Sequence, residues 1–354
     1  MDPHHGLRGN GVTKRTSEKQ RVTAAVGHRQ PDRTPYHVTF TEPARARMAE
    51  YYGDAGFEAG LSNCLQVIRM RLPYRPLADR PWIWEDEWGV QWDRSIDTDI
   101  GTVCNRRVTP ESLRQYRFPD PVAAERFGRF PAEIAAAGGR FVVATLAFTL
   151  FERAWSLAGM EEVLMAMAAG DPFADELFDG IMTFDESVVR RALEFDVDGV
   201  RFGDDWGQQQ GLIMGPVLWR KYIKPRVARL YGLVKSAGRR VFIHSCGKVD
   251  ELFPDLIECG VDVFNPFQPE VMDVQDIKRR YGRDITFFGG ISTQKTLPYG
   301  TVAQVRDEVR MLLDTVGRDG GYIAAPAHDI PRDARPENVA AMLDILRDQA
   351  MTAG

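Results

Sequence analysis

GRRVFIHSCGKVDELFPDLIECGVDVFNPFQ, residues 238–268, decides the fold of this chain. It contains two apolar runs, at 238–247 and 261–268, and between them a helical stretch at 249–260. The helical stretch ends in glycine, which is typical of a helix C-cap that leads directly into the next strand. Apolar strands on either side of an amphipathic helix indicate parallel strands of a sheet that helices cover.

The same alternation of strand and helix extends over most of the chain. Further strands are predicted at GGRFVVATLAF (138–148), VDGVRFGDDWG (197–207), DITFFGGIS (284–292) and GGYIAAPAHDI (320–330). Helices are predicted over residues 161–194, 218–237, 273–281, 302–316 and 336–349. This repetition favours a closed (β/α)8 barrel, or TIM barrel, that runs from about Pro35 to the C-terminus. No GxGxxG follows the first strand, which argues against a dinucleotide-binding fold.

The N-terminal part is less regular. The polar, basic run at residues 1–16 is expected to be a disordered leader before a single barrel domain at 17–354. Ser17 is a suitable N-cap for a helix, and the run from Tyr36 to Thr41 is expected to be the first barrel strand. We interpret residues 41–135 as an insertion between the first and second barrel strands. Within it, GVQWDRS and GTVCNRRV predict a β-hairpin.

Composition narrows the class of protein. The 354 residues are 44% hydrophobic and 27% charged, with a net charge of −5, and no Lys/Arg block indicates a nucleic-acid partner. Four cysteines in a chain of this length do not predict a disulfide framework. No apolar run reaches the roughly 18 residues of a membrane span, and the N-terminus lacks the apolar centre of a signal peptide. We therefore expect a cytoplasmic protein with neither a nucleic-acid nor a membrane partner.

The predicted strands change character at their C-terminal ends. VRF gives way to GDDWG, VFI to HSCG, VFN to PFQ, TFF to GGIS and YIAA to PAHDI. Barrel enzymes carry their active sites on this rim. Loop polarity alone could explain one such end. Several ends, each supplying His, Cys, Asp or Gln, predict an active site there.

His244 and Cys246 are the sharpest pair on this rim. Residues i and i+2 of a strand point to the same face, so both side chains could bind one ion. Imidazole and thiolate suit Zn²⁺, and a catalytic zinc site uses three protein ligands and one open position. His328 is the preferred third ligand, with Asp204 or Asp205 as alternatives. The other interpretation is a histidine that hydrogen-bonds substrate beside a small packed cysteine.

The remaining rim residues have weaker signals. Of the two adjacent aspartates, one should face the pocket while the other caps or braces a loop, and Asp204 is the preferred catalytic group together with His328. The expected substrate contacts are Phe148, Asp205, Asn265, Gln268 and Gly290. The two side-chain amides could instead satisfy loop backbone, and the glycine pair Gly289–Gly290 could instead serve tight packing.

The other cysteines are expected to be ordinary buried residues. They are Cys64, Cys104 and Cys259. Cys259 is excluded as a ligand because it lies on a helix at the end away from the rim.

At these residues the chain resembles the uroporphyrinogen decarboxylase superfamily. The resemblance is carried by SEKQRVTAAVGHRQPDRTPY, DEWGVQW, RFGDDWG, HSCGKVDELFPDLIECGVDVFNPFQ, FFGGISTQKTLPYGT and GGYIAAPAHDIPRDARPENV. It implies a (β/α)8 barrel and two main chemistries. One is cofactor-free decarboxylation of uroporphyrinogen, and the other is methyl transfer by zinc enzymes that work with a corrinoid protein.

The resemblance favours the methyltransferase branch. The decarboxylases carry an Arg-Gln-Ala-Gly-Arg-Tyr stretch after the first strand, whereas this chain reads HVTFTEPARARMAEYYG there, and no cluster of cationic donors for a substrate with many carboxylates stands out. The methyltransferases carry a His-x-Cys zinc pair, which His244-Ser245-Cys246 matches. Their third ligand is usually a cysteine near the last strand, where this chain has Ala325-Pro326-Ala327-His328. Either His328 or an acidic residue replaces that cysteine, or no zinc is bound.

The leading hypothesis is a zinc-dependent methyltransferase or demethylase. It would move a methyl group between a small methoxylated or methylated substrate and a corrinoid protein, with zinc on His244, Cys246 and His328 and with Asp204 orienting the substrate or managing the proton. One alternative is a metal-free decarboxylase of a small acid that uses Asp204 and His328. Another is a non-catalytic barrel that binds corrinoid or substrate. The resemblance also suggests a homodimer.

Overall fold

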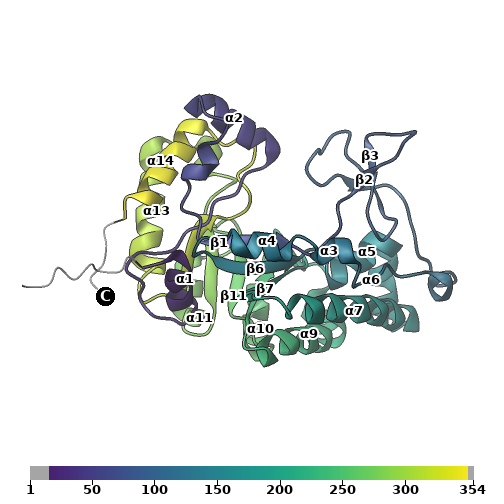
Figure 1. Cartoon of the computed structure of the whole chain (residues 1–354). Coiled ribbons are helices and arrows are strands. Elements are labelled where there is room, and N and C mark those ends of the chain that lie inside the picture. The colour runs from purple at the N-terminus through teal and green to yellow at the C-terminus, as the bar shows by residue number, and fades with distance from the viewer. Residues whose placement is uncertain (1–15, 350–354) are drawn as a thin grey trace, which may run out of the picture.

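The computed structural model describes residues 16–349, so residues 1–15 of the expected leader and residues 350–354 lie outside it. At its centre is a parallel sheet of seven strands in the order β1-β6-β7-β10-β11-β12-β13 (Figure 1). These strands are β1 (Leu65–Arg69), β6 (Phe141–Leu146), β7 (Gly199–Gly203), β10 (Arg240–His244), β11 (Val263–Phe267), β12 (Thr286–Ile291) and β13 (Tyr322–Pro326). The strands predicted from residue 138 onward are confirmed, within shorter bounds.

The sheet curls until both of its edges meet one segment of chain, residues 36–40. Tyr36 forms a parallel bridge with Ala324 of β13. On its other side, the carbonyl of Tyr36 accepts a hydrogen bond of 2.9 Å from the amide of Cys64, the residue before β1. The segment therefore occupies the place of an eighth strand between the two edges.

The strand predicted over 36–41 is nevertheless wrong, because this segment forms only isolated bridges. The side chain of Asn63 explains the interruption: its oxygen accepts from the amide of Val38 at 2.8 Å and its nitrogen donates to the carbonyl of the same residue at 2.9 Å. A side-chain amide thus replaces the backbone ladder that a strand would need. The structure shows a curled α/β sheet of seven strands, and a closed barrel of eight remains a prediction.

Helices follow most of the strands and cover the outer face of the sheet. The longer ones are α5 (Leu150–Ala158), α6 (Met160–Ala169), α7 (Pro172–Ala192), α9 (Lys224–Ser236), α10 (Phe253–Glu258), α11 (Val274–Tyr281), α13 (Val302–Met311) and α14 (Pro336–Arg347). The shorter ones are α3 (Ala124–Phe127), α4 (Phe130–Ala135), α8 (Gly215–Leu218) and α12 (Thr296–Tyr299), with π-helical turns at Trp219–Ile223 and Leu312–Val316. Of residues 16–349, no helix is both long and apolar enough to cross a membrane.

The single helix predicted over 161–194 is wrong, since α5, α6 and α7 occupy residues 150–192. Gly159 and Gly170 separate them, with φ angles of 89° and 72°, a left-handed conformation that glycine adopts without strain. The helical region therefore begins earlier than predicted, and the break at Gly170 interrupts the predicted stretch.

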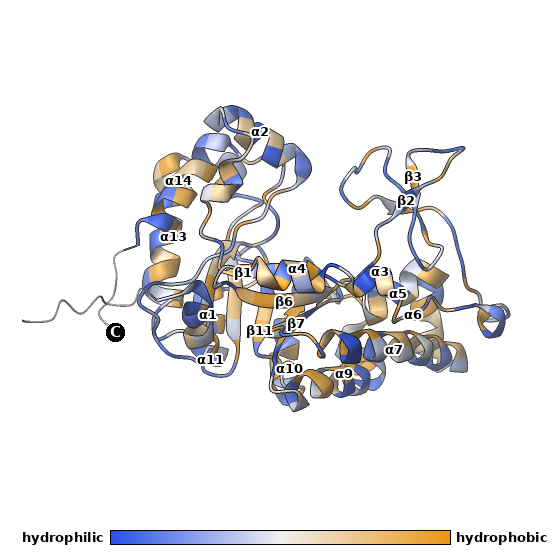
Figure 2. Cartoon of the chain, in the orientation of Figure 1, coloured by the Kyte–Doolittle hydropathy of each residue, from blue (hydrophilic) through white to orange (hydrophobic). Residues whose placement is uncertain are grey.

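The two faces of the sheet have different cores. Val200 and Phe202 of β7 belong to the large outer core against the helices, and so do Val241 and Ile243 of β10. The alternate positions point inward, where a smaller apolar cluster fills the end of the sheet at which the strands begin. That inner cluster contains Val22, Val26, Cys64, Leu65, Phe141, Val143, Phe242, Val263, Phe288, Ile323 and Ala325. Figure 2 shows the apolar character of the sheet most clearly along β6.

Helix α1 (Glu18–Val26) covers this apolar end. Its predicted N-cap is confirmed, because Ser17 and Gln20 form a reciprocal capping box. At its other end the carbonyl of Ala25 accepts a hydrogen bond of 2.8 Å from the amide of Gly321, next to β13. The helix therefore joins the start of the chain to the last strand.

Two elements stand above the opposite end of the sheet and well apart from each other (Figure 1): helix α2 (Glu42–Tyr52) and a small antiparallel sheet, which we call the arm. The arm consists of β2 (Arg75–Pro76), β3 (Ile83–Glu85), β4 (Gln91–Asp93) and β5 (Thr102–Val103), and the predicted hairpin is confirmed as β4–β5. The interpretation of 41–135 as one insertion is wrong, because β1 lies within it and pairs with β6. Five residues of LQVIR are too short a run to stand out from their polar surroundings.

Candidate active site

His244, Cys246 and His328 come together at the end of the sheet where the strands finish. Their ligand atoms all lie within 4.8 Å of one another. His244 ends β10, Cys246 follows in the loop, and His328 is exposed in the loop after β13. The Sγ of Cys246 is 3.5 Å from Nε2 of His244, about the separation of two ligand atoms on a tetrahedral zinc ion. The donor set and its spacing therefore fit zinc.

Asn265 sets the tautomer of His244. It lies beside His244 in the register of β10 and β11, and its nitrogen donates to the carbonyl of Phe288 at 3.0 Å. That bond turns its Oδ1 toward Nδ1 of His244, 2.6 Å away. Because an amide oxygen only accepts, Nδ1 carries the proton and Nε2 presents its lone pair toward Cys246. This is the form of histidine that binds a metal ion.

Burial shapes the protonation of both residues. It lowers the pKa of His244 to about 4, so the imidazole is neutral at pH 7. Burial also raises the pKa of the Cys246 thiol well above its ordinary value, and the nearby carboxylates of Asp205 and Glu152 raise it further. A bound dication would reverse this effect on the thiol, since metal binding releases its proton.

The two adjacent aspartates have different surroundings. The buried carboxylate of Asp204 accepts hydrogen bonds from the amides of Phe151 and Glu152 and from the indole of Trp206, at 3.0, 2.7 and 2.7 Å. It therefore braces the first turn of α5, and burial raises its pKa to about 7. Asp205 lies beside the metal cluster: its Oδ1 is 4.0 Å from Nε2 of His244 and accepts from the amide of Cys246 at 2.8 Å.

The preference for Asp204 as the pocket-facing aspartate thus conflicts with this geometry. The alternation of side chains along β7 explains why Asp205, and not Asp204, faces the cluster. Val200 and Phe202 face the helices, so Arg201, Gly203 and Asp205 share the inner face. The alternation of apolar and other residues in VRFGDD was a signal that could have separated the two aspartates.

The expected substrate contacts have other duties in the structure. Asn265 orients His244, and the oxygen of Gln268 accepts from the amide of Gly247 at 2.7 Å, which holds the loop after Cys246. A Cβ at Gly290 would lie 2.8 Å from the hydroxyl of Tyr322, so this glycine serves tight packing. Phe148 is half-buried with a φ of 53°, next to Trp92 at 5.1 Å between ring centroids. Its contact with substrate remains a prediction.

Two residues near the cluster were not predicted. Glu152 is half-buried at the start of α5, and burial, followed by the charges of Asp205 and Asp204, raises the pKa of its carboxyl well above the ordinary range. Arg201 lies on the inner face of β7. The only sequence feature that could have identified either residue is a charge within or just after an apolar run. For Arg201 this feature is visible in VRF.

The other cysteines differ in burial. Cys64 and Cys259 are buried as expected, whereas Cys104 is exposed, so the expectation of a buried residue is wrong there. It lies just beyond β5 of the arm, which is too small a sheet to cover it.

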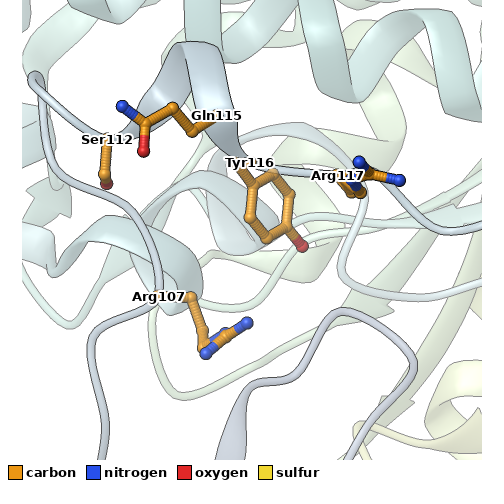
Figure 3. A pocket seen from close by; sticks show the side chains of 5 residues that line it. All are labelled: Arg107, Ser112, Gln115, Tyr116 and Arg117. Atoms are coloured by element: carbon orange, nitrogen blue, oxygen red, sulfur yellow. The ribbon is translucent and has the colours of Figure 1, made fainter.

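A separate hollow of about 350 Å³ is lined by residues that follow β5 in the chain (Figure 3). Its lining residues are Arg107, Ser112, Gln115, Tyr116 and Arg117. It shares no residue with the His244 cluster, and the hydroxyl of Tyr116 is already bound to the carbonyl of Trp88 at 2.9 Å. The His244 cluster therefore remains the candidate site.

Known proteins share sequence and fold with this chain. A family model described as uroporphyrinogen decarboxylase (URO-D) matches residues 105–349. The methylcobamide:CoM methyltransferase MtaA of Methanosarcina barkeri is 25% identical over 132 residues, which are 37% of this chain and 36% of that protein. The match thus spans little more than a third of the length of this relative. A solved methyltransferase from Methanosarcina mazei has a TM-score of 0.68 at 18% identity, with 94% of this chain and 99% of that one covered, which shows the same fold.

Proposed function

Because the chain belongs to the uroporphyrinogen decarboxylase (URO-D) family, and its relatives lie in the methyltransferase-like branch, we propose that it is a zinc-dependent methyltransferase. It moves a methyl group from a small methoxylated or methylated substrate to a corrinoid protein. The supporting observation is the convergence of His244, Cys246 and His328, whose ligand atoms lie within 4.8 Å of one another. In this proposal residues 17–354 form one catalytic domain, and the curled sheet is a variant of the (β/α)8 barrel.

The chemistry of methyl transfer matches this donor set. An ether or amine methyl has a poor leaving group, and zinc held by the three residues would act as a Lewis acid toward the departing atom. Asn265 keeps the Nε2 lone pair of His244 directed toward Cys246, where the ion would be held, and Asp205 holds the amide of Cys246 in place. The exposed position of His328 leaves the cluster open toward the end of the sheet at which a corrinoid protein would dock.

A proton source for the leaving group comes from α5. Burial keeps the Glu152 carboxyl protonated to a higher pH than usual, so it can hold the proton that the departing oxygen takes up. Asp204 binds the amide of Glu152 at 2.7 Å and acts as a positioning residue. The handling of the proton, which the sequence analysis gave to Asp204, is thus proposed for Glu152 instead.

The alternative of a metal-free decarboxylase fits less well. It needs Asp204 at the substrate, but this side chain is 2% exposed and accepts three hydrogen bonds from the protein. It also leaves the thiol of Cys246 without a function.

Metal content and turnover of purified protein test the proposal. Wild type should contain stoichiometric zinc and transfer a methyl group to free cob(I)alamin, which can be followed by absorbance. Cys246→Ala should lose the zinc and about 1,000-fold or more of the activity, since a Lewis acid contributes several kcal/mol. Cys104→Ala, at an exposed thiol on the arm, is the matched control and should change neither. A zinc-free wild type together with a fully active Cys246→Ala variant would refute the proposal.

A further inference from the structure

Three polar side chains form a row across the inner face of β1, β6 and β7. Arg69, Thr145 and Arg201 occupy one level of the sheet, since Arg69 pairs in register with Thr145, and Thr145 with Arg201. Their neighbours along the strands belong to the outer core: Ile68, Ala144, Leu146, Val200 and Phe202. By alternation the three side chains therefore point inward, on adjacent strands about 4.8 Å apart.

Neither guanidinium in this row has a partner among residues 16–349. Arg201 is half-buried, and within residues 16–349 its side chain forms no hydrogen bond and no ion pair. The charge of Asp329 acts on it from a distance, but that carboxylate is bound by the hydroxyl of Thr39. Arg69 is exposed at the open end, and among the described residues its guanidinium forms no hydrogen bond and no ion pair, although its backbone carbonyl accepts a hydrogen bond from Arg129.

Such an unpaired cation is costly inside a fold. Other buried arginines of this chain have carboxylate partners: Arg126 binds Glu87, and Arg153 binds Asp86. The row therefore has the donors for an oxyanion, and no group within the described part of the chain supplies one. Guanidinium pairs bind carboxylates in a planar, bidentate manner, and the threonine hydroxyl adds a further donor.

The row lies one inward-facing level nearer to the start of the strands than the His244 cluster. Arg201 is in register with Phe242 of β10, and His244 follows two residues later on the same inner face. At about 3.3 Å of rise per residue, the two levels are roughly 7 Å apart. A ligand whose one end reaches His244 and Cys246 therefore has its other end at Arg201. One six-membered ring with substituents at opposite positions spans this distance.

We propose that the Arg69–Thr145–Arg201 row binds the carboxylate of the substrate, so that the methyl donor is a small methoxylated or methylated acid. The carboxylate is held at the row while the methyl-bearing atom lies at the cluster. The orientation of the substrate rests on the proposed function, whereas the binding of the carboxylate does not. These arginines come from β1 and β7, outside residues 37–53, the stretch that corresponds to the arginine-containing motif of the decarboxylases.

Calorimetric titration with three probes tests the row. Wild type should bind 4-methoxybenzoate in the millimolar range or tighter, and 4-methoxybenzamide, the neutral analogue, much more weakly. Arg201→Gln should weaken 4-methoxybenzoate about 10- to 100-fold through the loss of charge-assisted hydrogen bonds, with a smaller effect for Arg69→Gln. Arg240→Gln, on the opposite end of β10 and already paired with Asp262 at 2.9 Å, is the matched control and should keep wild-type affinity.

Two further measurements separate this inference from the proposed function. Zinc content should be unchanged in Arg201→Gln, and Cys246→Ala should still bind 4-methoxybenzoate. Equal affinity for the acid and the amide, or wild-type affinity in Arg201→Gln, would overturn the inference even if zinc and methyl transfer are found. Tighter binding of 4-methoxybenzenesulfonate would overturn the choice of carboxylate. Conversely, carboxylate binding without zinc would contradict the proposed function alone.

Discussion

Two regions of this molecule hold arginines in different surroundings. Next to the arm, Arg153 donates to Asp86 at 2.7 Å and Arg126 donates to Glu87 at 2.9 Å. On the inner face of the sheet, Arg201 has no such partner among residues 16–349. Paired charges hold a fold together, whereas an unpaired one costs stability and persists where function needs it. The comparison therefore separates the parts that stabilise the chain from the part for which we infer ligand binding.

The paired region should show the largest effect. Asp86→Ala leaves the buried guanidinium of Arg153 without its carboxylate and removes acceptors for the amides of Trp88 and Val90. We expect the free energy of unfolding to fall by about 3–5 kcal/mol, as for other broken buried pairs. Urea unfolding measures this, and Glu125→Ala, which removes an exposed pair with Arg75, should change stability by less than about 0.5 kcal/mol. Equally small decreases in the free energy of unfolding of both variants would contradict the stabilising role given to the buried pair.

A second unpaired group on the inner side, His37, should make stability depend on pH. Its Nδ1 has no partner among the described residues, and burial lowers its pKa to about 3. The unfolded chain binds a proton near pH 6.5, whereas the folded chain does not. Stability is therefore intact above that pH and lost as the pH falls toward the folded pKa. At about pH 4.5 this costs roughly 2–3 kcal/mol.

His37→Gln should reduce this acid-induced loss. The measurement is the free energy of unfolding of metal-free wild type and variant in urea, at neutral pH and at the acid pH. The difference between the two proteins should shrink on acidification, because the variant has no imidazole to protonate. A parallel decline in both would show that other groups cause the acid sensitivity.

The orientation of His244 should matter for metal affinity more than for stability. In Asn265→Leu the acceptor for Nδ1–H is lost, so we expect about 10- to 100-fold weaker zinc binding. Competition with a chromophoric chelator measures it. Asn338→Leu is the matched control: that buried amide donates to the carbonyls of Leu297 and Gly300, so its loss should lower stability and leave zinc affinity unchanged. Similar zinc affinity in all three proteins would contradict the role given to Asn265.

The smallest expected effect is a gain. Arg201→Gln removes the unpaired cation from the inner face and should raise the free energy of unfolding by about 1 kcal/mol or less. Urea unfolding of the ligand-free protein measures it, with Arg153→Gln as the paired counterpart, which should lose stability. A loss for Arg201→Gln comparable to that for Arg153→Gln would show that Arg201 is structural.

Local patterns predicted much of the fold. Apolar runs separated by amphipathic stretches located six of the seven sheet strands, and the Ser17 cap located α1. The spacing of His244 and Cys246, with His328 after the last strand, predicted a cluster that the structure also brings together. These features depend on residues that are close in sequence or on a rule that holds for every strand of a parallel sheet.

The features that the sequence did not predict depend on residues that are far apart in the chain. β1 is short and becomes visible only through its pairing with β6. The break at 36–41 comes from the side chain of Asn63, which no pattern in the segment itself reveals. Asp204 and Asp205 could be distinguished only by fixing the phase of β7. The row of Arg69, Thr145 and Arg201 appears only when the register of three strands is known.

The attachment of α1 affects how the protein is made. Ribosomes produce this helix long before Gly321, which donates to Ala25, and before Ala324, the partner of Tyr36. The apolar end of the sheet that α1 covers therefore cannot close before residues 321–324 have been synthesised, and Val22 and Val26 lack this cover until then. The nascent protein is accordingly expected to depend on chaperones, and deletion of either α1 or β13 should leave this end of the sheet open.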